Sequence, residues 1–269
     1  MSGKSVLRVA VCGATGRMGG ELARVAAADA SVELVGGVAH SVLQDPAARG
    51  TGYPRLCPPG EAGDILRDAD AVVDFSSPDA LAHLLELHAD ALAERALVVG
   101  TTGLGAREEQ RLDAAAERGP VLVAANFSVG VNVLQALVRR AARALGDYDA
   151  EIVEAHHAGK TDAPSGTALA LGQALAAGRG VRLEDVRQDG RSGHTGARPA
   201  GQVGFHALRG GGVVGQHHVH FLGADERIEL AHVALDRRLF ARGALVAARW
   251  LVGRAPGRYT MAEVLGLDD

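Results

Sequence analysis

The stretch from Glu154 to Ala168, EAHHAGKTDAPSGTA, brings titratable side chains and helix-starting residues together within fifteen residues. An extended chain points the adjacent His156 and His157 to opposite faces, so the two imidazoles do not easily share one metal ion. They suit separate tasks: one as a proton donor or acceptor near neutral pH, the other for orienting or binding a ligand. Lys160 follows them, and its ammonium group can hold a carboxylate or donate a proton.

A helix start follows these groups. Ser165 suits an N-cap, Gly166 leaves the backbone open, and Thr167 begins the helix. Because a helix start binds anions, the combination favours a small substrate that carries carboxylates and whose reaction needs a proton. The alternative is that Lys160 pairs with Asp162 on the surface and that the histidines cap a strand end.

The first half of the chain alternates short apolar runs with Ala- and Leu-rich stretches. The run from Leu7 to Cys12 is followed by the glycine-rich GATGRMGG and then by apolar residues at helical spacing. The later β-rich runs are VELVGGVA, AVVDFS, ALVVGTT and VLVAA, and the intervening helical stretches are Ala80 to Ala93 and Ala106 to Arg118. Strands alternating with helices predict an α/β fold with a Rossmann-like, doubly wound parallel sheet.

The pattern changes after Asn126. A helix from Val131 to Leu145 leads to EIVEAHH, and GQVGFHALRG, VVGQHHVHF and ERIELAHVA predict three strands of an open mixed sheet. A second, α+β domain therefore begins near residue 127. The glycine-rich stretch from Asp189 to Gly204 is predicted to be a mobile surface loop. An apolar helix from Arg238 to Leu251 can belong to either domain, since periodicity does not distinguish them.

The glycine turn after the first predicted strand has the spacing G-x-x-G-x-x-G, at Gly13, Gly16 and Gly19. A backbone without Cβ atoms can turn tightly, approach a pyrophosphate and present helix N-terminal N–H groups to it. Arg17 adds a cation beside that anion. The alternative is a tight strand-to-helix connection that binds nothing. Two further loops fall at the carboxyl ends of strands, where such sheets bind ligands; they are Gly100 to Thr102 and Ala124 to Phe127.

Composition narrows the class of protein. The 269 residues are 47% hydrophobic, which is typical of a packed globular protein of one large or two modest domains. A net charge of -4 without long like-charge blocks argues against nucleic acid as a partner. Two cysteines, Cys12 and Cys57, are too few for a disulfide framework, and the first residues lack the apolar run of a signal peptide. We expect a soluble cytoplasmic protein with no membrane partner.

The motifs taken together resemble those of one family. GATGRMGG, DFSSP, GTTG, AANFSVGVN, EAHHAGKTDAPSGTALALG and GHTG occur in this order between residue 7 and the region beyond residue 230. In this they resemble dihydrodipicolinate reductases, which reduce 4-hydroxy-tetrahydrodipicolinate in lysine and diaminopimelate biosynthesis. AANFSVGVN and EAHH…K…DAPSGTA are highly specific to that family, whereas the glycine turn is common to many.

The resemblance implies a domain plan and a reaction. Residues 1–126 and 238–269 would form a dinucleotide-binding domain, and residues 127–237 a substrate-binding and oligomerisation domain of a homotetramer. The implied reaction transfers a hydride from NADH or NADPH to a cyclic dicarboxylate, with loss of water and protonation of an enamine-like intermediate.

The resemblance also implies roles for single residues. His156 matches the acid/base histidine of the family and Lys160 its proton-donating lysine. Its substrate-binding positions match His157, Gly166 and Thr167. Its cofactor-binding positions match Gly13, Ala14, Thr15, Gly16, Arg17, Met18, Gly100, Thr101, Thr102, Ala124, Ala125, Asn126 and Phe127.

The chain departs from the family after the second predicted strand. Where the family commonly carries an acidic residue for the adenosine ribose, this chain has His40 followed by Ser41. Neither an acid nor a dedicated arginine is evident there, which leaves both NADH and NADPH as candidates. The alternative is that His40 faces solvent and that Asp45 or Arg49 decides the preference.

The segment QHHVHF is richer in histidine than the resemblance implies. His218 and His220 would share one face of a strand, and two imidazoles at alternate positions can bind zinc. No third ligand is evident in the sequence, so no metal site is expected.

Two other functions compete with the reductase. One is a dehydrogenase of similar two-domain plan that acts on another dicarboxylate, such as aspartate. The other is a cofactor-binding regulatory or assembly protein without turnover. The EAHH motif and Lys160 argue against the latter, because a binding protein does not need a proton donor beside an anion pocket.

Overall fold

The computed structural model describes residues 6–40 and 52–267, and the chain forms two compact units. The first unit combines the chain up to Phe127 with the segment from Arg238 onward, and the second is Ser128–Arg237. Phe127 belongs to the first unit because its side chain is buried in that unit's core. Three residues considered for cofactor preference lie outside the described residues; they are Ser41, Asp45 and Arg49.

The first unit contains a seven-stranded parallel sheet in the order β12-β6-β5-β4-β1-β2-β3. Its inner strands are buried on both faces, as their continuous apolar runs require. The chain runs from β1 outward to β3 and then returns to β4 on the other side of β1, so β1 and β4 flank the topological switch point. The predicted doubly wound sheet is confirmed. The strands are β1 (Leu7–Cys12), β2 (Val32–Val38), β3 (Leu56–Cys57), β4 (Ala71–Asp74), β5 (Ala96–Val99), β6 (Pro120–Val123) and β12 (Gly257–Tyr259).

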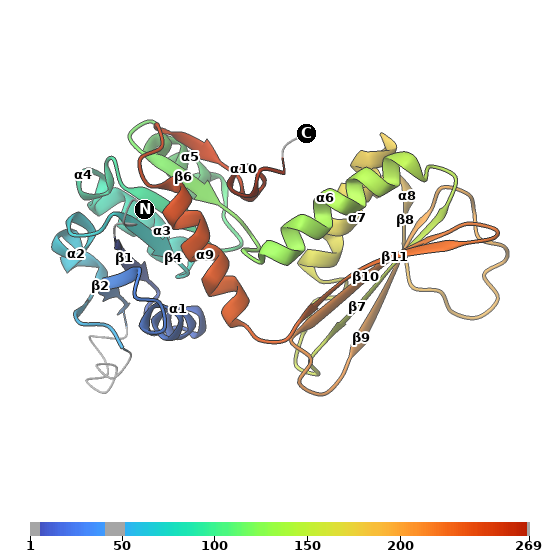
Figure 1. Cartoon of the computed structure of the whole chain (residues 1–269), viewed down its shortest axis with the longest axis horizontal. Coiled ribbons are helices and arrows are strands. Elements are labelled where there is room, and N and C mark those ends of the chain that lie inside the picture. Colours follow the sequence, from blue (N-terminus) through green and yellow to red (C-terminus); the bar gives the residue numbers. More distant parts are fainter. Residues whose placement is uncertain (1–5, 41–51, 268–269) are drawn as a thin grey trace. The chain divides into compact units, whose positions relative to one another are not determined.

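Helices cover both faces of this sheet, each over its own hydrophobic cluster. On one face, α1 and α9 lie side by side, and α10 packs against α9 (Figure 1). The other face is covered by α2 to α5. The helices are α1 (Arg17–Ala27), α2 (Gly63–Arg67), α3 (Pro78–Leu87), α4 (Ala89–Leu92), α5 (Ala106–Ala116), α9 (Arg238–Leu251) and α10 (Met261–Leu265), and η3 (Pro59–Glu61) is a 3-10 turn.

One predicted helix, Ala80 to Ala93, is two helices in the structure. The chain leaves helical geometry at His88, between α3 and α4. The His88 Nε2 atom lies 2.6 Å from the carbonyl oxygen of Pro59, so a contact with a distant turn replaces helix continuation. Composition alone does not reveal this contact.

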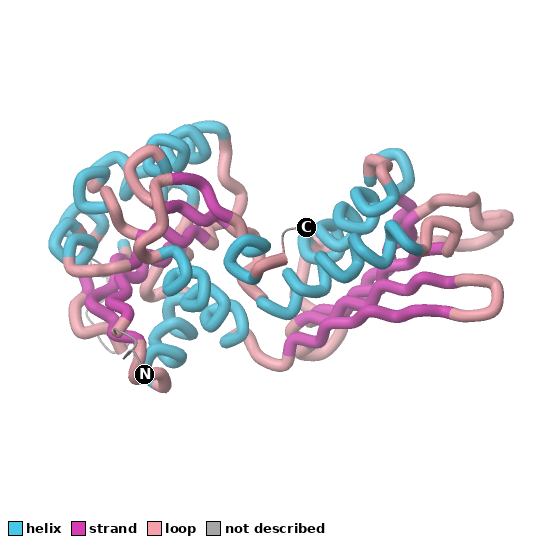
Figure 2. The backbone as a smooth tube through the Cα atoms, turned by 45° about the horizontal axis from the view of Figure 1, so that its top comes forward, coloured by secondary structure: helices cyan, strands magenta, loops and turns pink. Residues whose placement is uncertain are grey.

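The second unit contains a five-stranded mixed sheet in the order β11-β10-β7-β9-β8. β10 is antiparallel to β7 and β11, whereas β9 is parallel to β7 and β8. Helices α6 and α7 lie together against one face (Figure 2), and the cluster between them buries Ile152, Phe205 and Val219. The predicted open mixed sheet is confirmed. Its elements are α6 (Val129–Ala144), β7 (Asp149–His156), α7 (Gly166–Arg179), α8 (Leu183–Val186), β8 (Arg187–Asp189), β9 (Val203–Arg209), β10 (Gly215–Leu222) and β11 (Arg227–Ala234).

The two faces of the five-stranded sheet carry different side chains. In β10, His217 is buried on the side of the helices, whereas His218 and His220 lie on the opposite side. The register places His217 opposite Glu154 of β7 and His220 opposite Glu229 of β11, so each pair shares a face. We call the side packed against α6 and α7 the covered face and the opposite side the open face.

The glycine-rich stretch predicted as a surface loop runs mainly between β8 and β9. Two of its arginines, Arg191 and Arg198, donate hydrogen bonds to the Glu151 carboxylate on the open face, at 2.9–3.0 Å. Partial burial would raise the pKa of Glu151, but Arg191, His206 and Arg198 outweigh it and lower the pKa to about 2. The loop is therefore attached to β7 by ion pairs.

No helix among the described residues combines the length and the apolar composition that crossing a bilayer requires.

Candidate active site

The carboxyl ends of β1 and β4 border a cavity of about 310 Å³ in the first unit. The predicted glycine turn lines it through Gly13, Thr15 and Gly16, and His40 lines it from the end of β2. Helix α1 begins at this turn, with Gly16 as its N-cap. A helix N-terminus beside a cavity at a topological switch point is suited to bind an anionic group such as a pyrophosphate.

Close backbone contacts explain the glycines of this turn. Gly13 has a φ of 78°, and a Cβ atom there would lie 2.5 Å from the carbonyl oxygen of Phe75. A Cβ atom on Gly19 would lie 2.3 Å from the carbonyl oxygen of Ala14. A strand-to-helix connection that binds no ligand would require glycine at these positions for the same reason. The case for a ligand therefore rests on the cavity and the helix N-terminus.

The loop after β5 is joined to the end of β4 by a buried carboxylate. Asp74 is fully buried; it accepts hydrogen bonds from the hydroxyls of Thr101 and Ser76, the latter at 2.8 Å. Burial raises the pKa of Asp74, and the two hydroxyl groups oppose the rise. A Cβ atom on Gly100 would lie 2.1 Å from the ring of Phe75. The sequence analysis assigned no role to Asp74. Its position could have drawn attention to it, because it is a charged residue at the end of an otherwise apolar strand.

Three of the predicted cofactor positions have buried side chains. Thr101 is 5% exposed and donates to Asp74, and the other two are apolar. Ala14 is 0% exposed and Phe127 is 1% exposed, and both belong to the core. The Phe127 ring meets Phe75 edge-on at 5.6 Å. A ligand contact at these two positions would therefore involve the backbone. Other predicted positions are exposed; they are Thr15, Gly16, Arg17, Thr102 and Ala125.

In the second unit, His156 ends β7 beside a buried glutamate. Its Nδ1 atom lies 2.6 Å from Glu154 Oε2, because residues two apart on a strand share a face. Glu154 is 2% exposed, and it also accepts two hydrogen bonds from Arg209, at 2.7 and 2.8 Å, and one from the Ser165 N–H at 3.0 Å. Since a carboxylate only accepts, the shared proton belongs to Nδ1, and Nε2 remains for proton exchange.

The partners of Glu154 set its charge. Burial would raise the pKa of Glu154, but the hydrogen bonds from Arg209, His156 and Ser165 outweigh burial and lower the pKa below its usual value. The carboxylate is therefore ionised at neutral pH and can stabilise a protonated His156.

A second imidazole supports this arrangement from β10. His217 is 4% exposed; its Nε2 atom lies 3.1 Å from the hydroxyl oxygen of Ser165, which caps α7 by accepting from the Ala168 N–H. Its ring meets His156 edge-on at 5.2 Å. Burial, and then the nearby His156, lower the pKa of His217 to about 4, so it is neutral at pH 7. Sequence reasoning missed His217, because only the register places it beside this site.

The remaining predicted residues surround the start of α7. Lys160 Nζ lies 2.7 and 2.8 Å from the two carboxylate oxygens of Asp162, so the ion pair of the alternative interpretation is present. His157 Nε2 lies 3.5 Å from an Arg237 nitrogen. Gly166 and Thr167 open α7, and a Cβ atom on Gly166 would have no other atom within 4 Å. The space in front of this helix start is open.

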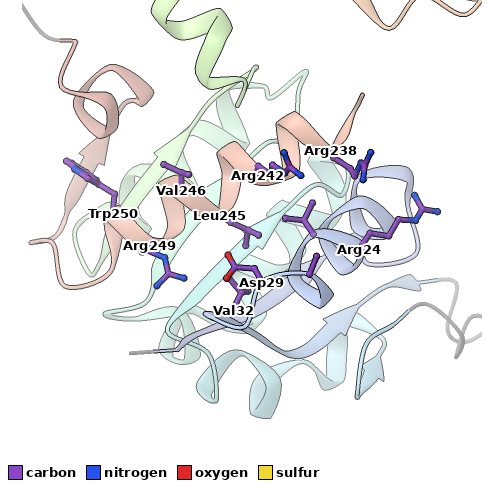
Figure 3. A pocket seen from close by; sticks show the side chains of 11 residues that line it. Arg24, Asp29, Val32, Arg238, Arg242, Leu245, Val246, Arg249 and Trp250 are labelled. Carbon is purple, nitrogen blue, oxygen red and sulfur yellow. The ribbon is translucent and has the colours of Figure 1, made fainter. Parts of the chain in front are cut away.

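Another cavity in the first unit, of about 750 Å³, lies between α1 and α9 (Figure 3). Four arginines line it together with Trp250 and apolar side chains; they are Arg24, Arg238, Arg242 and Arg249. The Arg249 guanidinium donates hydrogen bonds to Ser31, and Arg24 pairs with Glu21. None of its lining residues is a predicted substrate or cofactor position.

Comparison with known families assigns both units. Residues 7–127 match the family model described as "Dihydrodipicolinate reductase, N-terminus", and residues 130–265 match "Dihydrodipicolinate reductase, C-terminus". The chain is 48% identical to the 4-hydroxy-tetrahydrodipicolinate reductase of Parvibaculum lavamentivorans, over 97% of this chain and 98% of the relative. It is 49% identical to the protein of the same name from Methylocella silvestris, over 98% of each chain.

Solved structures support the fold. A dihydrodipicolinate reductase from Paenisporosarcina sp. TG-14, solved with dipicolinate bound, aligns with a TM-score of 0.75 at 23% identity, over 96% of this chain and 98% of that chain. A probable dehydrogenase from Thermotoga maritima aligns with a TM-score of 0.58 at 12% identity, over 97% of this chain and 93% of that chain.

Proposed function

Because the chain belongs to the dihydrodipicolinate reductase family, we propose that it reduces 4-hydroxy-tetrahydrodipicolinate to tetrahydrodipicolinate with loss of water, using NADH or NADPH. The reaction belongs to lysine and diaminopimelate biosynthesis. The observation that carries the proposal is the Glu154–His156 pair beside the open start of α7. This is a proton-transfer group next to an anion site, as a dicarboxylate substrate requires.

The residues of the first unit fit a dinucleotide. The cavity at the switch point, the glycines that let the backbone approach a ligand, and the N-terminus of α1 would hold the pyrophosphate. The exposed Arg17 and Thr102 would complete the predicted contacts. A bound reduced nicotinamide supplies the hydride.

The residues of the second unit would bind substrate and manage the proton. Glu154 orients the His156 ring and stabilises its charged form, so that Nε2 can give a proton to the developing enamine and take one back. Lys160 would exchange Asp162 for a substrate carboxylate, because a charge-assisted contact forms with whichever carboxylate is in reach. His157, Gly166 and Thr167 would receive the second carboxylate at the helix start.

Turnover and carboxylate binding test the proposal separately. The absorbance of the reduced nicotinamide should fall when the substrate is generated in place by the preceding enzyme. Pyridine-2,6-dicarboxylate should inhibit competitively with substrate, and Gly166→Val should abolish its binding, because the new side chain enters the open space before α7.

The matched control is Gly146→Val, since a Cβ atom on Gly146 also has no other atom within 4 Å but lies after α6. Calorimetry should show unchanged dicarboxylate binding by this control. Equal binding by Gly166→Val and the parent would place the anion site elsewhere, and absence of turnover would favour a binding protein.

The preference between NADH and NADPH is expected to be weak. His40 is exposed and lines the first-unit cavity, and a neutral imidazole can bond a ribose hydroxyl or a phosphate oxygen. We expect kcat/KM for the two cofactors to agree within about tenfold, or roughly 1.4 kcal/mol. A hundredfold preference that His40→Ala does not change would contradict this expectation.

We also propose that the chain works as a cytoplasmic homotetramer. Both cysteines, Cys12 and Cys57, are free thiols, which suits a reducing compartment. The open face exposes Leu208 and Val233, which are 56% and 46% accessible and lie on one row of the sheet. Sedimentation should give four times the 27.7 kDa of one chain. Leu208→Glu should lower that mass, whereas Leu235→Glu, beyond β11, should not.

A further inference from the structure

The open face of the five-stranded sheet brings together three residues with metal-ligating side chains: His218, His220 and Glu229. The two histidines occupy alternate positions of β10 and therefore share a face. Glu229 lies on β11, directly opposite His220 in the antiparallel register. One ligand atom from each residue lies within 4.8 Å of the others. Glu229 is the third ligand that the sequence does not reveal.

Both imidazoles contact the Glu229 carboxylate. His218 Nδ1 lies 2.6 Å from Glu229 Oε1, and His220 Nδ1 lies 3.8 Å from Glu229 Oε2. The two rings are stacked at 6.2 Å with 12° between their planes. Zinc takes such ligands at about 2.0–2.2 Å, so the rings must turn to converge on one ion. The terminal torsion of histidine is broad, and this turn costs little.

The other glutamates of the sheet are occupied differently. Glu154 binds Arg209 and a backbone N–H, and Glu151 binds two arginines of the loop before β9. Within the described part of the chain, the hydrogen bond and ion pairs found for Glu229 come from His218 and His220. An imidazole can release its proton and keep its place as a metal ligand, whereas a guanidinium group cannot.

We propose that His218, His220 and Glu229 bind one divalent transition-metal ion, with Zn²⁺ the best match to two imidazoles and one carboxylate. In the single chain all three side chains are partly exposed, which leaves a fourth position on the ion for water. Because β11 is the edge strand, the ion would cross-link it to β10. The site is separate from the covered face and has a structural role.

Zinc titration of the assembled, chelator-treated protein tests the site. Competition with a chromophoric chelator should show one high-affinity Zn²⁺ per chain, and Co²⁺ in its place should give visible ligand-field bands. Each of His218→Asn, His220→Asn and Glu229→Gln should weaken Zn²⁺ binding by more than about tenfold, since even indirect support of metal ligands is worth that much.

The matched control is His206→Asn, which removes an open-face imidazole whose partner is Glu151, at 2.8 Å. It should leave Zn²⁺ affinity unchanged. Zinc should also raise the Tm of the parent and of His206→Asn but not of Glu229→Gln, because a ligand stabilises the state that binds it. The proposal would be overturned if the parent did not bind Zn²⁺, or if the three ligand variants bound it as tightly as the parent. Loss of Zn²⁺ binding in His156→Gln would also overturn it.

Discussion

The covered and open faces of the five-stranded sheet both place imidazoles beside a glutamate, but with opposite results. On the covered face, Glu154 is 2% exposed and holds His156 within a network of hydrogen bonds. On the open face, the Glu229 side chain is 40% exposed and faces two stacked imidazoles. His217 and His218 are neighbours in sequence and yet belong to different faces.

The difference lies in what else binds each carboxylate. Arg209 and the Ser165 N–H hold both oxygens of Glu154, so its charge is fixed and its position is set. Such a group orients a neighbouring ring but has little capacity for a further ligand. Among the described residues, Glu229 accepts its hydrogen bond and ion pairs from imidazoles, and Arg227 acts on it only through its charge, so the carboxylate can still bind an ion. The same residue types therefore suit proton transfer on one face and metal binding on the other.

The largest contrast is expected in turnover. His156→Gln should lower kcat by about two to four orders of magnitude, because general acid–base assistance is of that size. His218→Gln, on the open face, should change kcat by less than about twofold. Steady-state kinetics would measure both, with cofactor binding as the check on folding. Near-normal turnover in His156→Gln would contradict a role for His156 in proton transfer.

A smaller contrast is expected in the pH dependence of stability. The pKa of His217 is lowered to about 4 from an ordinary value of 6.5. Between these two values, His217 binds a proton in the unfolded chain but not in the folded chain. The contribution of His217 to the free energy of unfolding is therefore fully present above pH 6.5. It falls by on the order of 3 kcal/mol on acidification toward pH 4. The half-buried His232, whose pKa burial also lowers, adds to the slope.

Urea unfolding at several pH values and fixed protein concentration would measure this slope. His217→Gln should flatten it between pH 6.5 and 4.5, whereas His218→Gln should leave it unchanged. Carboxylates act in a different pH range. Because the pKa of Glu154 is lowered, its contribution to the free energy of unfolding is fully present above its ordinary pKa of 4.5 and is lost only at lower pH. An unaltered slope in His217→Gln would mean that His217 takes up a proton in the folded state.

The smallest contrast concerns the two glutamates at neutral pH. Glu154→Gln should reduce the free energy of unfolding by about 2 to 3 kcal/mol, because it leaves the partly buried Arg209 without its charge partner. Glu229→Gln in metal-free protein should change it by less than about 0.5 kcal/mol, as is usual for an exposed position. Denaturant titrations at one protein concentration would compare the two. Equal losses would show that burial does not distinguish these carboxylates.

Much of the fold could be predicted because each long element carries its own periodic pattern. The apolar runs of β1, β4 and β5 are buried on both faces, as a parallel sheet requires. The shortest elements were not predicted. β3 has two residues and β12 has three, and each exists as a strand only because it pairs with a longer neighbour.

The candidate site was predictable only where its residues lie close together in the sequence. The stretch from His156 to Thr167 contains the groups that surround the start of α7. Arg209 and His217 come from other strands, and Glu229 depends on the register of β10 with β11. Strand order and register arise from packing of the whole sheet, so no local pattern reveals them. Glu154 was within reach, since an acid two positions before a histidine on a strand must share its face.

The position of α9 has a consequence for how the chain folds during synthesis. Helix α9 contributes Ala241, Ala244, Leu245, Ala248 and Leu251 to the same core cluster as β1, β4 and β5. The second unit interrupts the first, so the ribosome completes residues 128–237 before this helix exists. Until α9 emerges, this face of the nascent parallel sheet is covered by α1 alone and exposes apolar side chains to water. The inserted unit is thus the first that can reach its full set of contacts, and the nucleotide-binding unit closes last.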